Sequence, residues 1–543
     1  MSSAIGSDSP LRRLGIDVLL MVLDELRAQR ALRPFSATCR YVLSLSKPLL
    51  FRSWRMTDTF PFEKYSHWFP AHVRPHVRLL SILDGCLDRR SCIDQYEDMK
   101  STNNRHHVCG SLGPVLFERV LGDAPQLYSL TITGRGPAMH GMTWAALKVI
   151  LSTPHLRELK ISRGMLLCAR LSAADVEDMR TTDSLAPLSE LIYEVDSSEV
   201  SESFPAEMQV LTAILPKLAE SLTALVLPGT RAPLHIIRGT RWPNLREFAL
   251  RSKHWDVTVP PRPYASLVAQ MPNLRSLTLE LTPPASNEDV FVRPIGYTAG
   301  DRLQWPALEH LTISHPHPDD AIYEHLHPTL RSLSLRCWPP LVMVSWPYRT
   351  EDRLRTSSQM LHILLKCATS VHNLTSLHIE YEMDDEEIAL LSHIASAFPH
   401  MIELQIHRIR PLATTDASAN TNTNTVIASM VGECLAPLAQ LRTLRVHMKF
   451  DDVPKRHPAR RGWMYFRRDE LWDFVQGTLK EAATMLARSL AHSVESVALL
   501  DPESSWRRFL VRDESSGSRA ERKVTYDDAY YLQQSLPNQL IFY

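Results

Sequence analysis

The residues best suited to metal chemistry lie in one short segment, HPHPDDAIYEHLHP, at positions 315–328. Its ligand-type side chains are His315, His317, Asp319, Asp320, Glu324, His325 and His327. Zinc accepts imidazole nitrogens and carboxylate oxygens, but it needs them in a tetrahedral arrangement. Prolines constrain this segment and nothing in its spacing sets such an arrangement, so a solvated loop is favoured over a metal site.

A second set of ligand-type residues is Cys86, Cys92, His106, His107 and Cys109. The spacing C-x5-C followed by H-H-x-C matches no zinc-knuckle pattern, and free cysteines mostly behave as small buried hydrophobes. All eight cysteines of the chain are scattered without a C-x-x-C pair, which fits a reducing compartment. We therefore expect no metal and no disulfide framework.

Motifs of covalent catalysis are missing from the sequence. It contains no G-x-S-x-G elbow, no G-x-x-x-x-G-K-[ST] loop, no H-E-x-x-H and no G-x-G-x-x-G after a strand. No cysteine has a setting that would favour a reactive thiolate. We expect a protein that is not an enzyme and holds no cofactor.

A basic and aromatic segment invites comparison with nucleic-acid binding. Its members are Lys455, Arg456, His457, Arg460, Arg461, Trp463, Tyr465, Phe466, Arg467 and Arg468. Cations beside aromatic rings hold single-stranded nucleic acid. The chain as a whole is neutral, however, with 60 Lys and Arg against 60 Asp and Glu, so no global field favours such a partner. A solvated insert, or contact with an acidic protein segment, is the preferred interpretation.

The elements that would carry these residues follow from an internal repeat, the phrase L-x-x-L-x-L with conservative apolar exchanges. Its twelve copies begin at positions 127, 156, 188, 222, 245, 274, 308, 330, 374, 401, 441 and 494. Proline stands two residues before seven of them, where it separates a helix from the next strand. Helical patterns precede several copies, at 115–121, 144–151, 360–366 and 388–397.

Each unit therefore reads as a helix followed by a short strand. The last two apolar residues of the phrase point to one face of the strand, and the residue between them points to the other. Neither element buries its apolar side alone, but stacked neighbours do, which predicts an α/β solenoid. A non-repeat α/β protein with chance matches to the phrase is the alternative.

Over residues 114–500 the pattern resembles leucine-rich repeats. The spacing of 22 to 53 residues exceeds the regular period of about 20–29, which implies an irregular horseshoe with inserts at 412–425 and 451–470. The polar tract at 414–425 is expected to be a disordered loop, and the tail at 501–543 to be partly disordered.

The outward-facing strand positions are the expected binding surface for a target protein. In the seventh position after each phrase begins, six copies carry Arg251, Glu280, Arg336, Glu380, His407 and His447. Rows of mixed charge on a rigid sheet suit a protein of complementary charge. A solvated sheet face without a partner is the alternative.

The amino-terminal segment 11–54 stands apart from the repeats, and 55–113 is predicted to be a linker or partial repeat. Residues 16–26 form a strong helix candidate with apolar side chains nearly all round, 36–44 form another, and Pro48 is expected to break the chain. Helices so few and short enclose no large core. Their surplus apolar residues indicate a partner surface or a cap on the repeats.

This segment resembles the F-box, which docks on the adaptor Skp1 of cullin-RING ubiquitin ligases. The family phrase L-P-x-E-I-L-x-x-I compares with LGIDVLLMV at 14–22, and a V-C-R-like phrase with Thr38-Cys39-Arg40. Gly15 stands where the family usually has proline. The resemblance implies Skp1 contacts by Leu14, Gly15, Val18, Leu19, Val22, Leu32, Pro34, Cys39 and Leu50.

Taken together, the chain resembles fungal-type F-box proteins with leucine-rich repeats. That resemblance implies a substrate-recognition subunit of an SCF-type ubiquitin ligase, which binds Skp1, and through it a cullin, and holds a target on the repeats. The alternative is a ligase-independent scaffold that binds a protein or nucleic acid. The amino terminus has no signal-peptide pattern and no segment is long enough to span a membrane, so we expect a soluble protein of the cytoplasm or nucleus.

Overall fold

The computed structural model describes residues 14–29, 31–57, 69–84, 107–108, 112–134, 140–162, 164–182, 184–194, 205–252, 264–282, 291–293, 307–337, 354–411, 423–450, 452–458, 464–516 and 519–527. The chain divides into two compact units, Met1–Leu245 and Arg246–Tyr543. This division falls inside the region for which repeats are predicted. In the described residues no helix is both long and apolar enough to cross a membrane.

The structure confirms that every copy of the repeated phrase forms a strand. In unit 1 these strands are β4 (Ser129–Thr133), β6 (Glu158–Ser162), β8 (Glu190–Glu194) and β9 (Ala224–Pro228). They are preceded by β1 (Ser53–Thr57), at the start of the stretch 55–113 expected to be a linker or partial repeat, and by β2 (Leu79–Leu83) within it. All six pair in parallel in the order β1-β2-β4-β6-β8-β9.

The repeat strands of unit 2 form a longer parallel series. They are β10 (Glu247–Ser252), β11 (Ser276–Leu281), β12 (His310–Ser314), β13 (Ser332–Arg336), β14 (Ser376–Glu382), β15 (Glu403–Ile409), β16 (Thr443–His447) and β19 (Ser496–Leu500). Each pairs in parallel with the next in this order. The chain is therefore a mixed α/β protein in which parallel strands follow one another in chain order.

One backbone junction recurs between neighbouring strands in both units. The carbonyl of the phrase's second residue accepts the N–H groups of the second and third residues of the next copy. In unit 2, for example, the carbonyl of Arg246 accepts from Arg275 (2.8 Å) and Ser276 (2.9 Å). In unit 1 that of Arg157 accepts from Ser189 (2.8 Å) and Glu190 (2.9 Å). A carbonyl oxygen has two lone pairs, so the shared acceptor fixes the register of each strand on the last.

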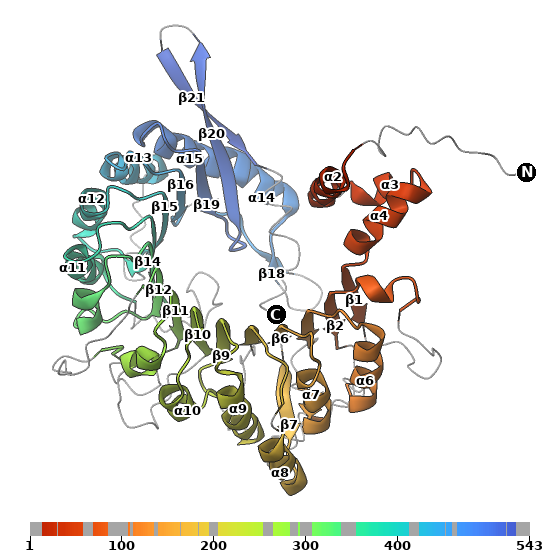
Figure 1. The fold of residues 1–543 in the computed structure, drawn as a ribbon. Helices are drawn as coiled ribbons and strands as arrows, with labels where there is room; N and C mark the ends of the chain where they lie inside the picture. The colour runs from red at the N-terminus through yellow and green to blue at the C-terminus, as the bar shows by residue number, and fades with distance from the viewer. Residues whose placement is uncertain are drawn as a thin grey trace, which may run out of the picture. The chain divides into compact units, whose positions relative to one another are not determined.

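Helices lie along one side of the strands within each unit (Figure 1). In unit 1 they are α6 (Pro114–Asp123), α7 (Trp144–Leu151), α8 (Ala173–Thr181), α9 (Pro205–Leu218) and α10 (Leu234–Gly239). In unit 2 they are α11 (Ser357–Ala368), α12 (Glu387–Ala397), α13 (Thr423–Leu435), α14 (Arg468–Phe474) and α15 (Lys480–Ser489). One π-helical turn (Val475–Leu479) joins α14 to α15, and short 3₁₀ helices replace α-helices at Tyr264–Gln270 and Ala321–His325.

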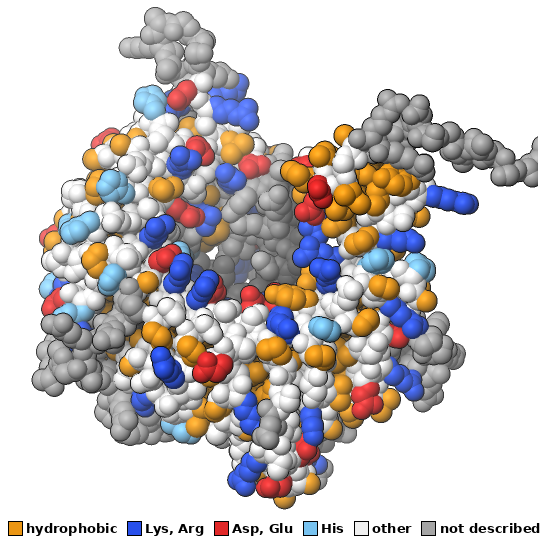
Figure 2. Space-filling view, in the orientation of Figure 1, with side chains coloured by type: hydrophobic (Ala, Val, Ile, Leu, Met, Phe, Trp, Pro, Cys, Tyr) orange, Lys and Arg blue, Asp and Glu red, His pale blue; other side chains and the backbone are white. Residues whose placement is uncertain are grey.

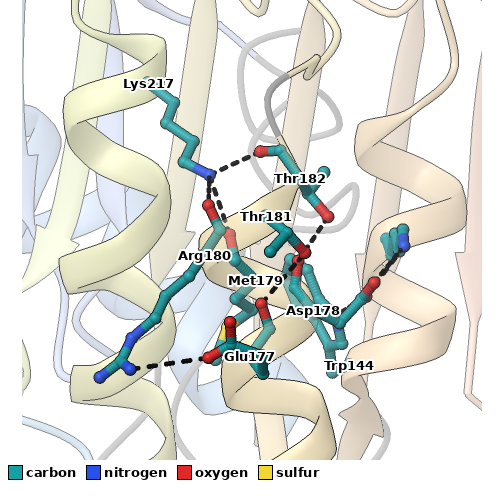
Figure 3. Close-up of polar contacts among 9 residues, drawn as sticks. Trp144, Glu177, Asp178, Met179, Arg180, Thr181, Thr182 and Lys217 are labelled. Carbon is teal, nitrogen blue, oxygen red and sulfur yellow. Dashed lines mark hydrogen bonds and ion pairs between the residues drawn. The ribbon is translucent and has the colours of Figure 1, made fainter.

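A second, three-stranded parallel sheet lies in unit 1, with the order β3 (His107–Val108), β5 (His140–Thr143) and β7 (Met165–Arg170). Helix α8 follows β7 and is held by side chains of its neighbours (Figure 3). Asp178 accepts from the Trp144 indole (2.7 Å) and from Lys148 (2.6 Å), and Lys217 of α9 donates to the carbonyls of Met179 and Thr182. These bonds hold α8 between α7 and α9.

A buried charge network closes the free edge of β7. The N–H of Leu167 donates to the carboxylate of Glu207 at 2.9 Å, in the place where a further strand would supply a carbonyl. The same carboxylate accepts from the hydroxyl of Tyr193 and from Arg231 (2.8 Å). Burial raises the pKa of Glu207, and burial together with the Glu207 charge raises that of Tyr193. Unit 2 contains a counterpart, in which Arg408 holds Glu387 through two bonds of 2.6 Å and Tyr381 donates to it.

The tail, expected to be partly disordered, contains an ordered part. Strands β20 (Trp506–Ser516) and β21 (Arg519–Tyr526) form an antiparallel hairpin on β19. Buried Phe509 and Val524 attach it, and Arg522 donates to the carbonyls of Leu490 (2.9 Å) and Ala491 (2.7 Å) just after α15. A guanidinium suits that position because the end of a helix presents unpaired carbonyls. The many charges of this segment hide its strand pattern.

Two smaller expectations are also wrong. The polar tract predicted to be a loop to residue 425 ends earlier, because α13 begins at Thr423; residues 412–422 lie outside the described part. Pro48 does not break the chain, because it lies in the last turn of α4 (Arg40–Leu50), where Phe51 still donates to the Lys47 carbonyl at 3.0 Å. A proline near a helix end removes one hydrogen bond without ending the helix at once.

Candidate interaction surfaces

Three amino-terminal helices form a small module with its own core. They are α2 (Ile16–Ala28), α3 (Leu32–Ser36) and α4 (Arg40–Leu50). Their buried residues are Leu19, Leu23, Leu32 and Val42, against which Leu26, Phe35, Tyr41, Leu45, Leu49 and Leu50 pack. Four fully buried side chains make a core too small to use all the apolar residues of α2.

The remaining apolar residues of α2 face solvent. Met21 is 74% exposed, Ile16 58%, Val18 49%, and Leu20 and Val22 40% each, and Leu14, just before the helix, is 41% exposed. At about 100° per residue Met21 lies opposite the stripe that carries Leu19 and Leu23, and Val18 and Val22 lie between Met21 and that stripe; Leu14 precedes the helix. Figure 2 shows hydrophobic side chains gathered over this helix. We call Leu14, Val18, Met21 and Val22 the outer face of α2. A contiguous exposed apolar patch of this kind marks an interaction site.

The residues expected to contact an adaptor separate into two groups. Leu14, Gly15, Val18, Val22, Pro34 and Cys39 are exposed, and Leu50 is half-buried. Leu19 and Leu32, in contrast, are 1% and 4% exposed, so they stabilise the module instead of presenting a surface. A family phrase does not separate core positions from contact positions. Met21 was missed, although its place one turn before Glu25 and opposite Leu19 puts it on the outer face.

Gly15 begins α2 in an extended conformation. Its φ is −56° and its ψ 144°, and its carbonyl accepts the first helical hydrogen bond, from Leu19 at 3.0 Å. Proline has φ near −65°, so the backbone at Gly15 is one that proline also adopts. The glycine therefore keeps the geometry that the family's proline would impose.

The outward positions of the repeat strands in unit 2 lie in two rows. One row carries Ser334, His378, Gln405 and Arg445, which are in register on β13, β14, β15 and β16. The other carries Glu380, His407 and His447, also in register. The sequence prediction that residues of neighbouring copies align on one face is confirmed by this register.

Three of the six outward residues expected to form the surface for a target protein are buried. Glu280, Glu380 and His407 are 3%, 2% and 5% exposed, whereas Arg251, Arg336 and His447 are exposed or half-buried. Glu280 is buried because it bonds two guanidiniums, Arg251 of β10 at 2.8 Å and Arg336 of β13. Glu380 accepts the N–H of Cys337 at 2.8 Å. Charges on neighbouring strands thus neutralise one another before any partner binds.

His378, Gln405 and His407 form a compact group on the same face, here called the His–Gln–His cluster. The Gln405 amide nitrogen lies 2.7 Å from Nε2 of His378 and 2.8 Å from Nε2 of His407. The two imidazoles stack with 5.2 Å between centroids, and Trp506 of β20 packs edge-on against His407 at 5.3 Å. Burial and the charges of Arg336 and Arg445 lower the pKa of His378 to about 3, and burial lowers that of His407 well below its usual range. Sequence reasoning missed Gln405 and Trp506.

The segments that suggested a metal site do not form one in the part of the chain that the structure describes, where no three His, Cys, Asp or Glu side chains are grouped to hold a metal ion. Asp320 instead binds backbone, accepting the N–H groups of Val292 (2.6 Å), Arg293 (3.0 Å) and Ile322 (3.0 Å). Burial raises its pKa to about 6. Cys86, Cys92, His106 and Cys109 lie outside the described residues.

Within the described part of the basic and aromatic segment, two basic side chains lie beside one carboxylate and a third stacks on an aromatic ring. His457 lies 3.0 Å from Glu470, Arg467 lies 3.6 Å from the same carboxylate, and Arg456 stacks on Phe466. A surface hollow is lined by Arg468, Asp469 and Trp472. Arg460, Arg461 and Trp463 lie outside the described residues.

Fold and surfaces together define a class: an α/β protein of stacked parallel-strand units, with a small helical module before them that exposes an apolar face. Comparison with known proteins adds no family to this class. No protein-family model matches the chain, and no curated protein matches it.

Proposed function

We propose that this protein is the substrate-recognition subunit of an SCF-type ubiquitin ligase. The amino-terminal helices act as an F-box that docks on Skp1, and through it on a cullin, and the stacked units act as irregular leucine-rich repeats that hold a target protein. The observation that carries the proposal is the outer face of α2, which is apolar and exposed on a module that otherwise has a complete core. The residues there that match the F-box phrase are Leu14, Val18 and Val22.

The mechanism is proximity. A receptor that binds target and adaptor at once raises the effective concentration of target lysines beside the ubiquitin-loaded enzyme, and covalent chemistry belongs to its partners. The rigid register of the strands supports this role, because a receptor must hold a target at a fixed position. The cytoplasm or nucleus, where such ligases act, is the proposed location.

The test uses the full chain and recombinant fungal Skp1. Val18→Asp with Val22→Asp places two charges on the outer face without touching the core. Truncating one interface hot spot costs about 2 kcal/mol or more, so we expect binding to weaken at least about thirtyfold in calorimetry. Leu19→Asp would be a poor probe, because Leu19 is 1% exposed and the change would unfold the module.

The matched control is Arg119→Asp, an exposed position of α6 outside the amino-terminal module that changes the net charge by the same two units. It should bind Skp1 like the wild type, and circular dichroism should show both variants folded. Absence of wild-type binding at micromolar concentrations would refute the proposal. Equal binding by the Val18/Val22 double variant would refute the assignment of the outer face.

A further inference from the structure

The His–Gln–His cluster has a hydrogen-bond pattern that fixes the state of both histidines. The Gln405 amide oxygen lies 3.3 Å from a guanidinium nitrogen of Arg445, which can only donate. The amide nitrogen must therefore face the two imidazoles. It carries two hydrogens and no available lone pair, so it donates to Nε2 of His378 and to Nε2 of His407.

Both rings consequently carry their proton on Nδ1. The lowered pKa values of the two histidines agree with neutral rings that accept at Nε2. The Nδ1–H of His407 is buried, and among the described residues it has no hydrogen-bond partner. The hydroxyl of Ser334, in register with His378 on the adjacent strand, is likewise buried without one. Buried donors are nearly always paired, so this face is set up for an acceptor that a ligand would bring.

A metal ion does not fit the same place. The Nε2 lone pairs of His378 and His407 already accept from Gln405, and their Nδ1 atoms are protonated. The cluster offers N–H groups and no free lone pair, so its ligand must be a hydrogen-bond acceptor and not a metal ion.

The charges around the cluster define which acceptor fits. Arg336 and Arg445 are close enough to lower the pKa of His378, and both are half-buried, hence within reach of a partner. Each also has a carboxylate: Glu280 bonds Arg336, and Glu403 lies 3.1 Å from Arg445. Glu380, in register with His407, adds a further negative charge. This balance favours a group with one negative charge over a dianion such as phosphate.

We propose that His407, Arg336 and Arg445 form a carboxylate-binding subsite for the target protein. One oxygen accepts from Nδ1–H of His407, and the guanidiniums interact with the remaining charge. The carboxylate comes from an acidic side chain or from the carboxyl terminus of the target. The inference rests on the proposed function only in taking the partner to be a protein held on this face.

The experiment measures thermal stability of the full chain, at constant ionic strength, with graded concentrations of three probes. N-acetylglycine presents a terminal carboxylate, the α-amide of N-acetylaspartate presents a side-chain carboxylate, and inorganic phosphate presents a dianion. We expect saturable stabilisation by one or both carboxylate probes. The probe that binds more tightly shows whether the target supplies its carboxyl terminus or an acidic side chain. His407→Phe keeps a ring against Trp506 but removes the donor, and it should weaken the apparent affinity at least about tenfold.

Arg445→Met provides a second variant at a half-buried position, in case His407→Phe fails to fold. It should lower the apparent affinity for the carboxylate probes severalfold. His372→Phe is the control, since His372 is exposed and outside the rows, and it should respond like the wild type. Tighter binding of phosphate, no saturable response, or an unchanged response in both variants would overturn the subsite. None of these results depends on Skp1, so the subsite and the ligase role fail separately.

Discussion

Replacement of Arg231 by methionine tests how far a buried charge network stabilises unit 1. Arg231 and Glu207 are 4% and 0% exposed, and their charged atoms are 2.8 Å apart. Methionine fills similar volume but, among the described residues, leaves the carboxylate with Tyr193 and Leu167 as its donors. Breaking a buried pair on one side commonly costs about 3–5 kcal/mol.

The structure sets a ceiling on this cost. A buried carboxylate that loses its cation can take up a proton, and at pH 7 protonation from the ordinary pKa of 4.5 spans 2.5 pH units. At about 1.36 kcal/mol per unit this is about 3.4 kcal/mol at pH 7 and about 0.7 kcal/mol at pH 5. The folded pKa of Glu207 is raised, so the folded state holds more protons than the unfolded state above pH 4.5, and stability falls as the pH rises. The variant should therefore be destabilised far more at pH 7 than at pH 5.

Hydrogen–deuterium exchange of peptides from β7, β8 and α9 is the suitable assay, because it reports on unit 1 by itself. Arg180→Met is the matched control: its partner Glu177 lies 3.7 Å away with both side chains about 70% exposed, and such pairs contribute about 0–1 kcal/mol. Arg231→Met combined with Glu207→Gln should recover most of the loss, because the amide removes the buried charge and still offers an acceptor to the Leu167 N–H and the Tyr193 hydroxyl. Equal destabilisation of Arg231→Met at pH 5 and pH 7 would refute this reasoning.

Three further predictions concern single positions. Gly15→Pro should stabilise the helical module by about 0.4–1 kcal/mol, because φ is already −56° and proline restricts the unfolded chain; faster exchange of α2 amides would contradict this. Gly141→Ala should destabilise β5 by about 1–3 kcal/mol, because the new Cβ would lie 2.4 Å from that of Ala169. Gly122→Ala, with open space around it, is the control. Equal amide hydrogen exchange in the two variants would contradict the packing argument. Asp320→Asn should remove a pH dependence from the stability of unit 2. The folded pKa of Asp320, about 6, exceeds the ordinary 3.8, so wild-type stability falls as the pH rises from about 4 to about 6. Parallel plots of unfolding free energy against pH for wild type and variant, measured by urea titration, would contradict this.

The strands were the most predictable part of the molecule. Their apolar residues are two apart, and burial at Leu277 and Leu279 or at Leu404 and Ile406 follows from that period alone. The hairpin β20–β21 escaped prediction because charged residues occupy most of its positions, and Arg522 is buried only through carbonyls that a distant helix supplies. The spacing of apolar residues along a segment does not predict hydrogen-bond partners that a distant segment supplies.

The candidate surfaces were predictable only as positions. The register of His407 with Glu380 follows from the repeated phrase, but its burial does not, because Trp506 reaches it from a strand outside the repeats. In the same way the phrase at 14–22 indicates an apolar helix, whereas the choice of Leu19 for the core and Val18 for solvent depends on where α4 packs. Tertiary contacts, not residue type, separate core from contact residues here.

The shared carbonyl between neighbouring strands makes the register of the sheet independent of the outward side chains. Since the junction at Arg246, Arg275 and Ser276 uses backbone atoms alone, substitution of those side chains leaves it intact. Segments between strands can lengthen or shorten at little entropic cost, because closing a longer loop grows only with the logarithm of its length. Descendants of such a chain can thus exchange outward residues and whole connecting segments one at a time. That freedom would suit the receptor role proposed above.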